Sequence, residues 1–195
     1  MTWEQLEAAY RHLTDKFSNG YGPVYQRLRG TLPQAARVLE VGVAGGGSLR
    51  LWQAAFPGGL IAGVDCDSGA GWPDGTARIV ADQDSPKLPA LAWAASPGGY
   101  DLIIDDASHL GLLSRVTFGL LWPLVVPGGW YVFEDWAVGV PGNDPFFGIF
   151  DGTSQLDFAQ DLLARCGRFP GREDADAEEV LGRAGIIALR KRAAR

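Results

Sequence analysis

Short apolar runs that lie beside glycines recur along the chain, and they constrain its fold more than any other feature. Five such runs are rich in β-branched and aromatic residues and read as strands: 37–41, 60–64, 77–81, 102–104 and 130–133. They are continuous rather than alternating, which is typical of strands covered on both faces. Helical windows lie between them at 48–55, 85–95 and 108–125, each with a serine as the expected N-cap. The alternation predicts an α/β fold, a doubly wound and mostly parallel central sheet with helices on both faces.

The segments outside this alternation add elements at both ends. Residues 2–5 have the spacing of a capping box and predict a helix that runs to about residue 15, followed by a second helix at 23–29. After the fifth strand we expect a loop rich in glycine and proline over 137–152, a helix near 155–165 and a final apolar run at 186–189. Hydrophobic residues make up 47% of the chain, and there is neither an internal repeat nor a long linker. The prediction is therefore one domain over 1–195, in which residues 1–33 form a cap or a substrate-side element.

The charge balance excludes one class of partner. The chain has 17 Lys and Arg against 23 Asp and Glu, a formal net charge of −6, which argues against nucleic acid as the main partner. The basic cluster is at the end of the chain and consists of Arg190, Lys191, Arg192 and Arg195. We expect it to be a solvated tail rather than a binding arm.

The apolar and cysteine content bears on location. The longest apolar stretch, 118–133, is interrupted by two prolines and two glycines, so no membrane-spanning segment is expected. The first residues lack the layout of a signal peptide. Cys66 and Cys166 match no metal-ligand spacing and are expected to be reduced. These features predict a cytoplasmic protein.

A glycine-rich loop follows the first predicted strand and leads into a helix. Its glycines would let the backbone approach a ligand, while the helix N-terminus offers free N–H donors. The match to G-x-G-x-x-G is imperfect, because Ala44 stands at the second glycine. Asp65 ends the second strand 23 positions after Gly42, close to the separation at which a carboxylate accepts hydrogen bonds from a ribose. The pattern favours a nucleoside site, although a simple tight turn would use the same glycines.

Carboxylates follow the fourth and fifth strands in pairs. Asp105 and Asp106 end one strand and Glu134 and Asp135 end the next, so four acidic groups would gather at one sheet edge if the strands are neighbours. Their repulsion calls for a cation, and oxygen ligands favour Mg²⁺, then Mn²⁺ or Ca²⁺. The alternative is that the first pair caps a helix and the second is solvated. His109 follows closely and has a side chain suited to accepting a proton near neutral pH.

These motifs resemble a known group of enzymes. The pattern E-x-G-x-A-x-G from Glu40, followed by Asp65, resembles the first motifs of class I S-adenosylmethionine-dependent methyltransferases. D-D-A-S-H after the fourth strand, with P-G-G-x-Y-x-x-E-D after the fifth, is similar to the metal-dependent sugar O-methyltransferases of macrolide biosynthesis, the mycinamicin and macrocin group, and to cephalosporin-hydroxylase-type relatives. An upstream segment with Lys16, Tyr21 and Tyr25 also resembles theirs. The resemblance covers about residues 12–136.

The resemblance implies a Rossmann-like fold, S-adenosylmethionine as the methyl donor and Mg²⁺ or Mn²⁺ as the metal. It implies that Asp106, Glu134 and Asp135 hold the metal and that His109 is the catalytic base. The residues it implies for the donor are Glu40, Gly42, Gly46, Ser48, Asp65, Asp82, Gln83 and Asp105. A metal that binds two neighbouring oxygens would suit a small-molecule acceptor with vicinal oxygens, here a sugar of a glycosylated natural product. Relatives commonly form homo-oligomers. The chain departs from the pattern at Ala44, in a shorter glycine loop and at Asn19, where relatives often have a histidine.

Two other functions compete with this interpretation. A nicotinamide-dependent oxidoreductase would use the same loop for a pyrophosphate, but it has no need for the acid at Glu40. A non-catalytic partner subunit with the methyltransferase fold would be expected to lose the set of histidine and carboxylates, which this chain retains. The aromatic residues after the acidic pair are expected to form either a lid over the acceptor or packed core: Trp136, Phe146, Phe147 and Phe150.

Overall fold

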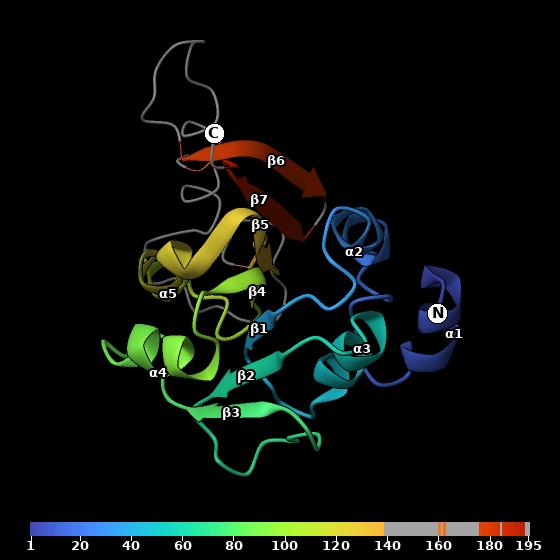
Figure 1. The fold of residues 1–195 in the computed structure, drawn as a ribbon, viewed down its shortest axis with the longest axis horizontal. Helices are drawn as coiled ribbons and strands as arrows, with labels where there is room; N and C mark the ends of the chain where they lie inside the picture. The colour runs from blue at the N-terminus through green and yellow to red at the C-terminus, as the bar shows by residue number, and fades with distance from the viewer. Residues whose placement is uncertain (139–159, 161, 163–175, 184, 194–195) are drawn as a thin grey trace.

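A seven-stranded sheet forms the centre of the part of the chain that the structure, a computed structural model, describes: residues 1–138, 160, 162, 176–183 and 185–193. The strands are β1 (Val38–Val41), β2 (Ile61–Asp65), β3 (Ala77–Val80), β4 (Tyr100–Asp105), β5 (Val125–Glu134), β6 (Ala177–Arg183) and β7 (Ile186–Lys191). Their order is β3-β2-β1-β4-β5-β7-β6 (Figure 1). Neighbours among β1 to β5 are parallel, whereas β7 is antiparallel to β5 and to β6. The predicted doubly wound, mostly parallel sheet is confirmed.

Helices cover both faces of this sheet (Figure 1). One layer holds α1 (Trp3–Tyr10), α2 (Gly22–Arg29) and α3 (Gly47–Ala55), and the other holds α4 (Leu88–Ala95) and α5 (Gly111–Leu121). Successive residues of β5 show why its sequence is apolar throughout. Trp130 packs in the hydrophobic core under the first layer and Tyr131 in the core under the second, and both are fully buried.

The strand order reverses between β1 and β4, and the loops after these strands meet there. The N–H of Asp106 donates to the carbonyl of Val41 at 2.9 Å. Gly42 has a φ of 98°, and a Cβ at this position would lie 2.1 Å from the carbonyl oxygen of Asp106. Only glycine fits at this position, so the first loop is pressed directly against the loop that carries the acidic pair.

The predicted helix starts were wrong by one to three residues. The helix α3 begins at Gly47 after Gly46 in the left-handed region, and Ser48 donates its hydroxyl to Glu40 at 2.7 Å instead of capping. The helices α4 and α5 begin three residues after Ser85 and Ser108, whose hydroxyls accept from backbone N–H groups just before each helix. The capping box at residues 2–5 is confirmed, but α1 ends at Tyr10 rather than near residue 15.

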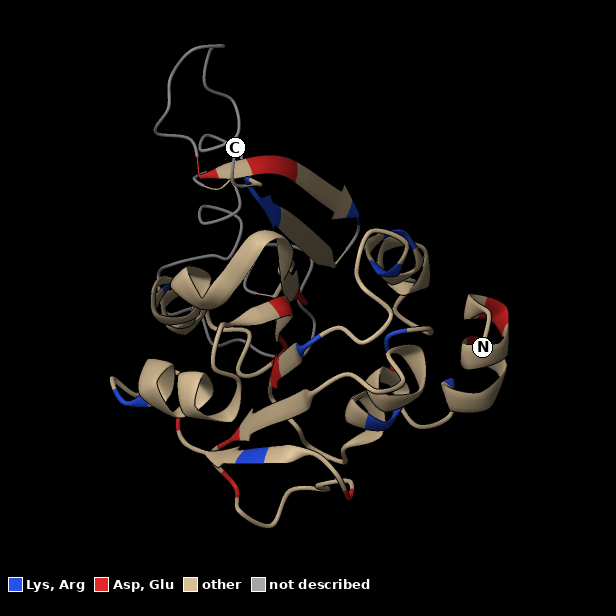
Figure 2. Ribbon diagram, viewed as in Figure 1, with Lys and Arg blue, Asp and Glu red and all other residues tan. Residues whose placement is uncertain are grey.

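The basic residues at positions 190 and 191 are not a solvated tail. They belong to β7, whose basic stretch lies beside the acidic stretch of β6 (Figure 2). The Nε of Arg190 lies 3.3 Å from Oε1 of Glu178, and its Cζ lies 5.7 Å from the centre of the Trp130 ring. Lys191 donates to the carbonyl of Val125 at 2.7 Å. That expectation was wrong because both side chains have acceptors on neighbouring strands and on the segment that enters β5.

Within these described residues, no helix has the length and apolar character needed to cross a membrane. The predicted helix near 155–165 lies almost wholly outside them. So do the aromatic residues Phe146, Phe147 and Phe150, and Cys166.

Candidate active site

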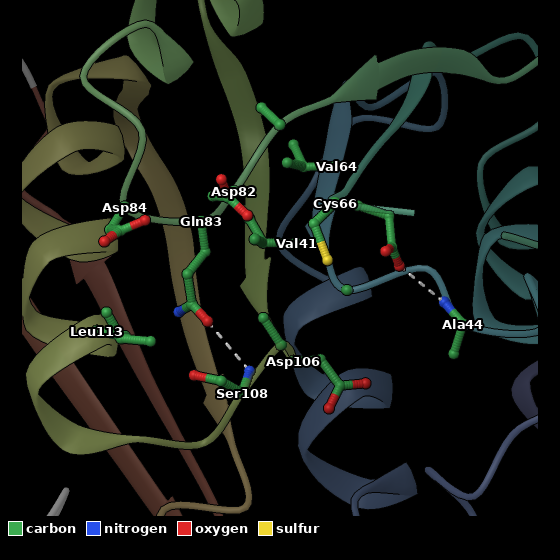
Figure 3. A pocket seen from close by; sticks show the side chains of 14 residues that line it. Val41, Ala44, Val64, Cys66, Asp82, Gln83, Asp84, Asp106, Ser108 and Leu113 are labelled. Carbon is green, nitrogen blue, oxygen red and sulfur yellow. Dashed lines mark hydrogen bonds between the residues drawn. The ribbon is translucent and has the colours of Figure 1, made fainter. Parts of the chain in front are cut away.

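A cavity of about 410 Å³ opens at the carboxyl ends of β1 to β4 (Figure 3). Four residues predicted to bind the donor line it: Gly42, Asp65, Asp82 and Gln83. Asp106 also lines it, so the cavity reaches the acidic pair. The other four predicted donor residues are not on the cavity wall: Glu40, Gly46, Ser48 and Asp105. The structure therefore divides the predicted donor set into residues that face the cavity and residues that lie behind it.

Asp65 holds the first loop against the end of β2. Its Oδ2 accepts hydrogen bonds from the N–H of Val43 at 2.8 Å and of Ala44 at 3.1 Å, and its Oδ1 accepts from the N–H of Asp67 at 2.9 Å. Burial raises the pKa of this carboxyl, but the backbone donors outweigh it and the pKa is lowered. Ala44 has a φ of 46°, a left-handed conformation that this anchored loop imposes on a non-glycine residue.

Gln83 ties the end of β3 to the loop before α5. Its Oε1 accepts from the N–H of Ser108 at 3.2 Å, and its Nε2 donates to the hydroxyl of Thr117 at 3.0 Å (Figure 3). Asp82, next to it, is exposed, and its carboxylate makes no hydrogen bond or ion pair with the described residues. Of these two adjacent side chains, Asp82 is the one left available to a ligand.

Glu40 is completely buried beneath the first loop. Its Oε2 accepts from the hydroxyl of Ser48 at 2.7 Å and from Nε1 of Trp52 at 3.1 Å. Its Oε1 lies 3.0 Å from Nζ of Lys16. A buried carboxylate needs a cationic or hydrogen-bonding partner, and the structure supplies both.

Lys16 stands at the centre of the acidic cluster, which we define as Glu40, Asp106 and Glu134. Its Nζ lies 2.8 Å from Oδ2 of Asp106 and 2.8 Å from Oε1 of Glu134, in addition to Glu40. Its side chain is only 1% exposed. Burial alone would lower the pKa of Lys16, but the three carboxylates raise it well above its usual value, so the ammonium stays charged. One cation thus faces three carboxylates.

Two tyrosines contact the carboxylates at the end of β5. The hydroxyl of Tyr25 donates to Oε1 of Glu134, and that of Tyr21 donates to Oδ1 of Asp135. Burial raises the pKa of both phenols, and the neighbouring carboxylates raise it further, so both remain protonated donors. Burial also raises the pKa of Glu134 well above its usual value, although Lys16 opposes this shift.

Asp106, His109 and Asp135 come together at the surface of this region. Each offers one ligand atom, and these atoms all lie within 4.8 Å of one another. The Nε2 of His109 is 3.7 Å from Oδ2 of Asp135. His109 and Asp135 have φ values of 57° and 52°, which are strained for residues with a side chain. Strain of this kind persists where the surroundings impose it and is concentrated at functional sites.

These residues fit a hard divalent cation. The carboxylates of Asp106, Glu134 and Asp135 offer oxygen ligands, which Mg²⁺ prefers, and together with Glu40 they carry more negative charge than Lys16 can neutralise. The Oε2 of Glu134 is buried and has no hydrogen-bond partner among the described residues. A second positive charge at this edge would satisfy that oxygen and reduce the repulsion.

Comparisons with known proteins agree with the geometry. No family model matches the chain. Demethylmacrocin O-methyltransferase of Streptomyces fradiae is 35% identical over 190 residues, which cover 86% of this chain and 48% of that protein. Mycinamicin VI 2''-O-methyltransferase of Micromonospora griseorubida is 38% identical over 149 residues, 70% of this chain and 37% of that protein. The chain thus spans about half the length of the curated relatives it matches or less.

A solved structure is similar along nearly the whole chain. The MycE methyltransferase of the mycinamycin biosynthetic pathway, in complex with Mg and SAH, superposes with a TM-score of 0.78 and 32% identity, covering 99% of this chain and 55% of that one. The chain is a homologue of the macrolide and sugar O-methyltransferases, with the class I S-adenosylmethionine-dependent methyltransferase fold. TomG, an O-methyltransferase from Streptomyces achromogenes, shares the fold alone, with a TM-score of 0.59 and 18% identity.

In this methyltransferase fold Asp105 lies away from the cavity. It is buried against Tyr131, on the face that α5 covers. Burial, followed by the charge of Asp106, raises its pKa to about 7. A direct contact of Asp105 with the donor remains a prediction.

The sequence pointed to the N-terminal segment of this methyltransferase homologue only by resemblance and gave Lys16, Tyr21 and Tyr25 no role. A signal was nevertheless present. Tyr21 and Tyr25 are four positions apart, which places both on one side of a helix. Four carboxylates expected at one sheet edge also called for a cation, which a lysine can supply, and Lys16 lies just upstream of that tyrosine pair.

Proposed function

We propose that the chain catalyses transfer of a methyl group from S-adenosylmethionine to a hydroxyl of a small molecule, with the assistance of Mg²⁺. The acceptor that we propose is a sugar of a glycosylated natural product. The observation that carries the proposal is the convergence of Asp106, His109 and Asp135 beside a cavity at the strand ends. The curated relatives that methylate macrolide and tetracenomycin sugars support the choice of acceptor.

The donor would occupy the cavity. Gly42 leaves room for it, and Asp65 and Asp82 offer carboxylate oxygens to its hydroxyl and amino groups. Gln83 keeps the wall formed by Ser108 in place. Glu40, Gly46 and Ser48 act from behind, because they fix the first turn of α3, whose free N–H groups suit an anionic carboxylate. Asp105 is buried away from the cavity wall, and we propose that it supports the donor site from there.

Asp106, Glu134 and Asp135 would hold the metal, either Mg²⁺ or Mn²⁺. When bound there, the ion supplies a Lewis acid that makes the acceptor hydroxyl more acidic. An acceptor that offers two neighbouring oxygens to the same ion would be fixed in one orientation, so we propose a vicinal pair of oxygens in the substrate.

His109 is the proposed base. Its Nε2 would take the hydroxyl proton as the bond between oxygen and the methyl carbon forms and the bond between that carbon and sulfur breaks. Asp135, at 3.7 Å, would stabilise the imidazolium that results. The strained backbone at both residues supports this role, because it fixes the two side chains toward each other.

Three wider expectations accompany this proposal. We propose that residues 1–195 form one methyltransferase domain in which residues 1–33 are a substrate-side element, since this segment supplies Lys16, Tyr21 and Tyr25 to the site. We also propose that the chain assembles as a homo-oligomer, which sedimentation would measure. The cytoplasm, where the methyl donor is made, is the proposed location.

Calorimetry with S-adenosylhomocysteine, with and without Mg²⁺, tests the donor and the metal. Binding of S-adenosylhomocysteine in preference to NAD is expected, and the reverse would favour an oxidoreductase. Absence of binding in both conditions would overturn the proposal. Incubation with S-adenosylmethionine, Mg²⁺ and a set of glycosylated macrolides, read by mass spectrometry, should then give a product with one added methyl group. A protein that binds the donor but methylates no member of a broad set would support the non-catalytic alternative.

A further inference from the structure

Each of the three proposed metal ligands has one oxygen already held by the segment that runs from Lys16 to Tyr25. Lys16 contacts Oδ2 of Asp106 and Oε1 of Glu134, both at 2.8 Å. The hydroxyl of Tyr25 donates to the same oxygen of Glu134, and that of Tyr21 donates to Oδ1 of Asp135. These contacts join residues 90 to 118 positions apart in the sequence. The segment thus reaches all three ligands.

The second oxygen of each carboxylate makes none of these contacts. The Oε2 of Glu134 is buried and has no hydrogen-bond partner among the described residues. The Oδ2 of Asp135 faces His109 at 3.7 Å. The Asp106 carboxylate is 22% exposed and lines the cavity, with only its Oδ2 on Lys16. Each of the three carboxylates is therefore arranged to bind a metal ion through a single oxygen.

Lys16 is itself fixed from the opposite side. Glu40 lies 3.0 Å from its ammonium and is held in turn by Ser48 and Trp52. The lysine cannot follow Asp106 or Glu134 if either rotates to present both oxygens, because it would leave Glu40 buried without its cation. The arrangement resists two-oxygen binding by these carboxylates.

Mg²⁺ and Ca²⁺ respond differently to such a constraint. Mg²⁺ is small and takes six ligands in a strict octahedron, which single carboxylate oxygens suit, whereas Ca²⁺ takes six to eight and commonly binds both oxygens of a carboxylate. We propose that Lys16 and Tyr21 are positioning residues that make the three carboxylates single-oxygen ligands and thereby select Mg²⁺ over Ca²⁺. This inference rests on the proposed metal site.

Lys16→Met tests it through metal binding without donor or acceptor. Calorimetric titration with Mg²⁺ and with Ca²⁺ gives the ratio of the two dissociation constants. Loss of the lysine charge strengthens the attraction of the carboxylates for both divalent ions alike. A change in the ratio of the two dissociation constants therefore reports only how Lys16 positions the carboxylates. Wild type is expected to prefer Mg²⁺, and Lys16→Met should lower that preference about tenfold, the lower end of what outer-shell partners of a metal site contribute. The exposed Lys87→Met is the matched control and should keep the wild-type ratio.

Tyr21→Phe provides a second variant that leaves the charge unchanged. It frees Oδ1 of Asp135 and should also lower the preference for Mg²⁺ over Ca²⁺, by several-fold. If circular dichroism shows that Lys16→Met does not fold, Tyr21→Phe alone tests the inference. A wild-type preference for Ca²⁺, or an unchanged ratio in every folded variant, would overturn the inference and leave the proposed function standing. If wild type binds neither ion, the metal in the proposed function fails as well.

Discussion

The two halves of the candidate site are built in different ways. On the donor side, Asp65 is anchored to the loop after β1 by contacts between positions 21 and 22 residues apart, and Asp82 beside it is exposed. On the metal side, Glu134 and Asp135 are held by tyrosines 109 and 114 positions away. The donor half therefore depends on short segments around each strand end, whereas the metal half exists only when distant parts of the chain are folded together.

The two halves also differ in charge and in the number of residues with a strained backbone. The metal side has one ammonium for three buried or partly buried carboxylates, and two of its residues, His109 and Asp135, are in the left-handed region. The donor side has one such residue, Ala44. Of the two predicted donor carboxylates that line its cavity, Asp65 accepts from backbone N–H groups and Asp82 is exposed. We expect chemistry and metal affinity to be lost by changes on one side, and donor affinity by changes on the other.

His109→Ala is expected to give the largest difference between its effect on turnover and its effect on donor affinity. Turnover should fall by roughly 10² to 10⁴, the usual contribution of a general base. Affinity for S-adenosylhomocysteine should be unchanged, because His109 does not line the cavity. A methylation assay and calorimetry on the same preparation measure both, with the exposed His12→Ala as the control. Retained turnover would exclude His109 as the base.

Asp135→Asn should weaken Mg²⁺ binding by about a hundredfold, since loss of a ligand charge exceeds or matches the effect of losing its outer-shell partner. Donor affinity in the absence of metal should not change. Mg²⁺ titration by calorimetry measures the effect, and Asp74→Asn, on the exposed loop before β3, serves as the control. Equal Mg²⁺ affinity in the two variants would remove Asp135 from the metal site.

Gly42→Ala tests the contact between the loop after β1, on the donor side, and the loop after β4, on the metal side. The added Cβ would lie 2.1 Å from the carbonyl oxygen of Asp106, and the φ of 98° is strained for alanine. The free energy of unfolding should fall by about 2 kcal/mol or more, and donor and metal binding should weaken together. Gly45→Ala, where a Cβ meets open space, should stay within about 0.5 kcal/mol of wild type. Chemical denaturation measures both variants, and equal stabilities would show that the loops are not pressed together.

Asp105, which lies behind both halves, is expected to make stability depend on pH. Asp105 has a pKa raised to about 7 in the folded protein, so the folded state binds its proton more tightly than the unfolded state does. Its contribution to stability is present near pH 4 and is lost as pH rises toward 7. Asp105→Asn should remove this loss, so the variant should gain roughly 2–3 kcal/mol relative to wild type between pH 5 and pH 8. Denaturation of the metal-free proteins at both pH values is the measurement, and parallel pH profiles would contradict the prediction.

The sequence predicted β1 to β5 because each has a run of mostly apolar residues, although β3, at the edge of the sheet, is only partly buried. It missed β6, an edge strand whose charged and half-exposed residues form no apolar run. The same reason explains the error over Arg190 and Lys191, since a basic end of a chain resembles a tail until neighbouring strands are known. Local patterns also misplaced the helix starts, because the hydroxyl of Ser48 is used by Glu40 rather than by the helix.

For the site, the sequence predicted the residue types and the strand ends where they gather. Asp106, His109 and Asp135 lie together, whereas the third predicted ligand, Glu134, is not in that group and contacts Lys16 and Tyr25. The tyrosine pair just downstream of Lys16 hinted at this segment, but the sequence could not reveal that the lysine would be buried among three carboxylates. That role depends on β1, β4 and β5 ending at one edge beneath the N-terminal segment, which is a property of the whole fold.

The position of Lys16 also has a consequence for the order in which the protein folds. The sheet can form its central strands from residues 38–134, but three carboxylates at its edge repel one another until the ammonium is in place. Docking of residues 16–25 and closure of that edge must therefore occur as one cooperative event. We expect this N-terminal segment to be needed for the edge to close, because it carries the ammonium that the three carboxylates require.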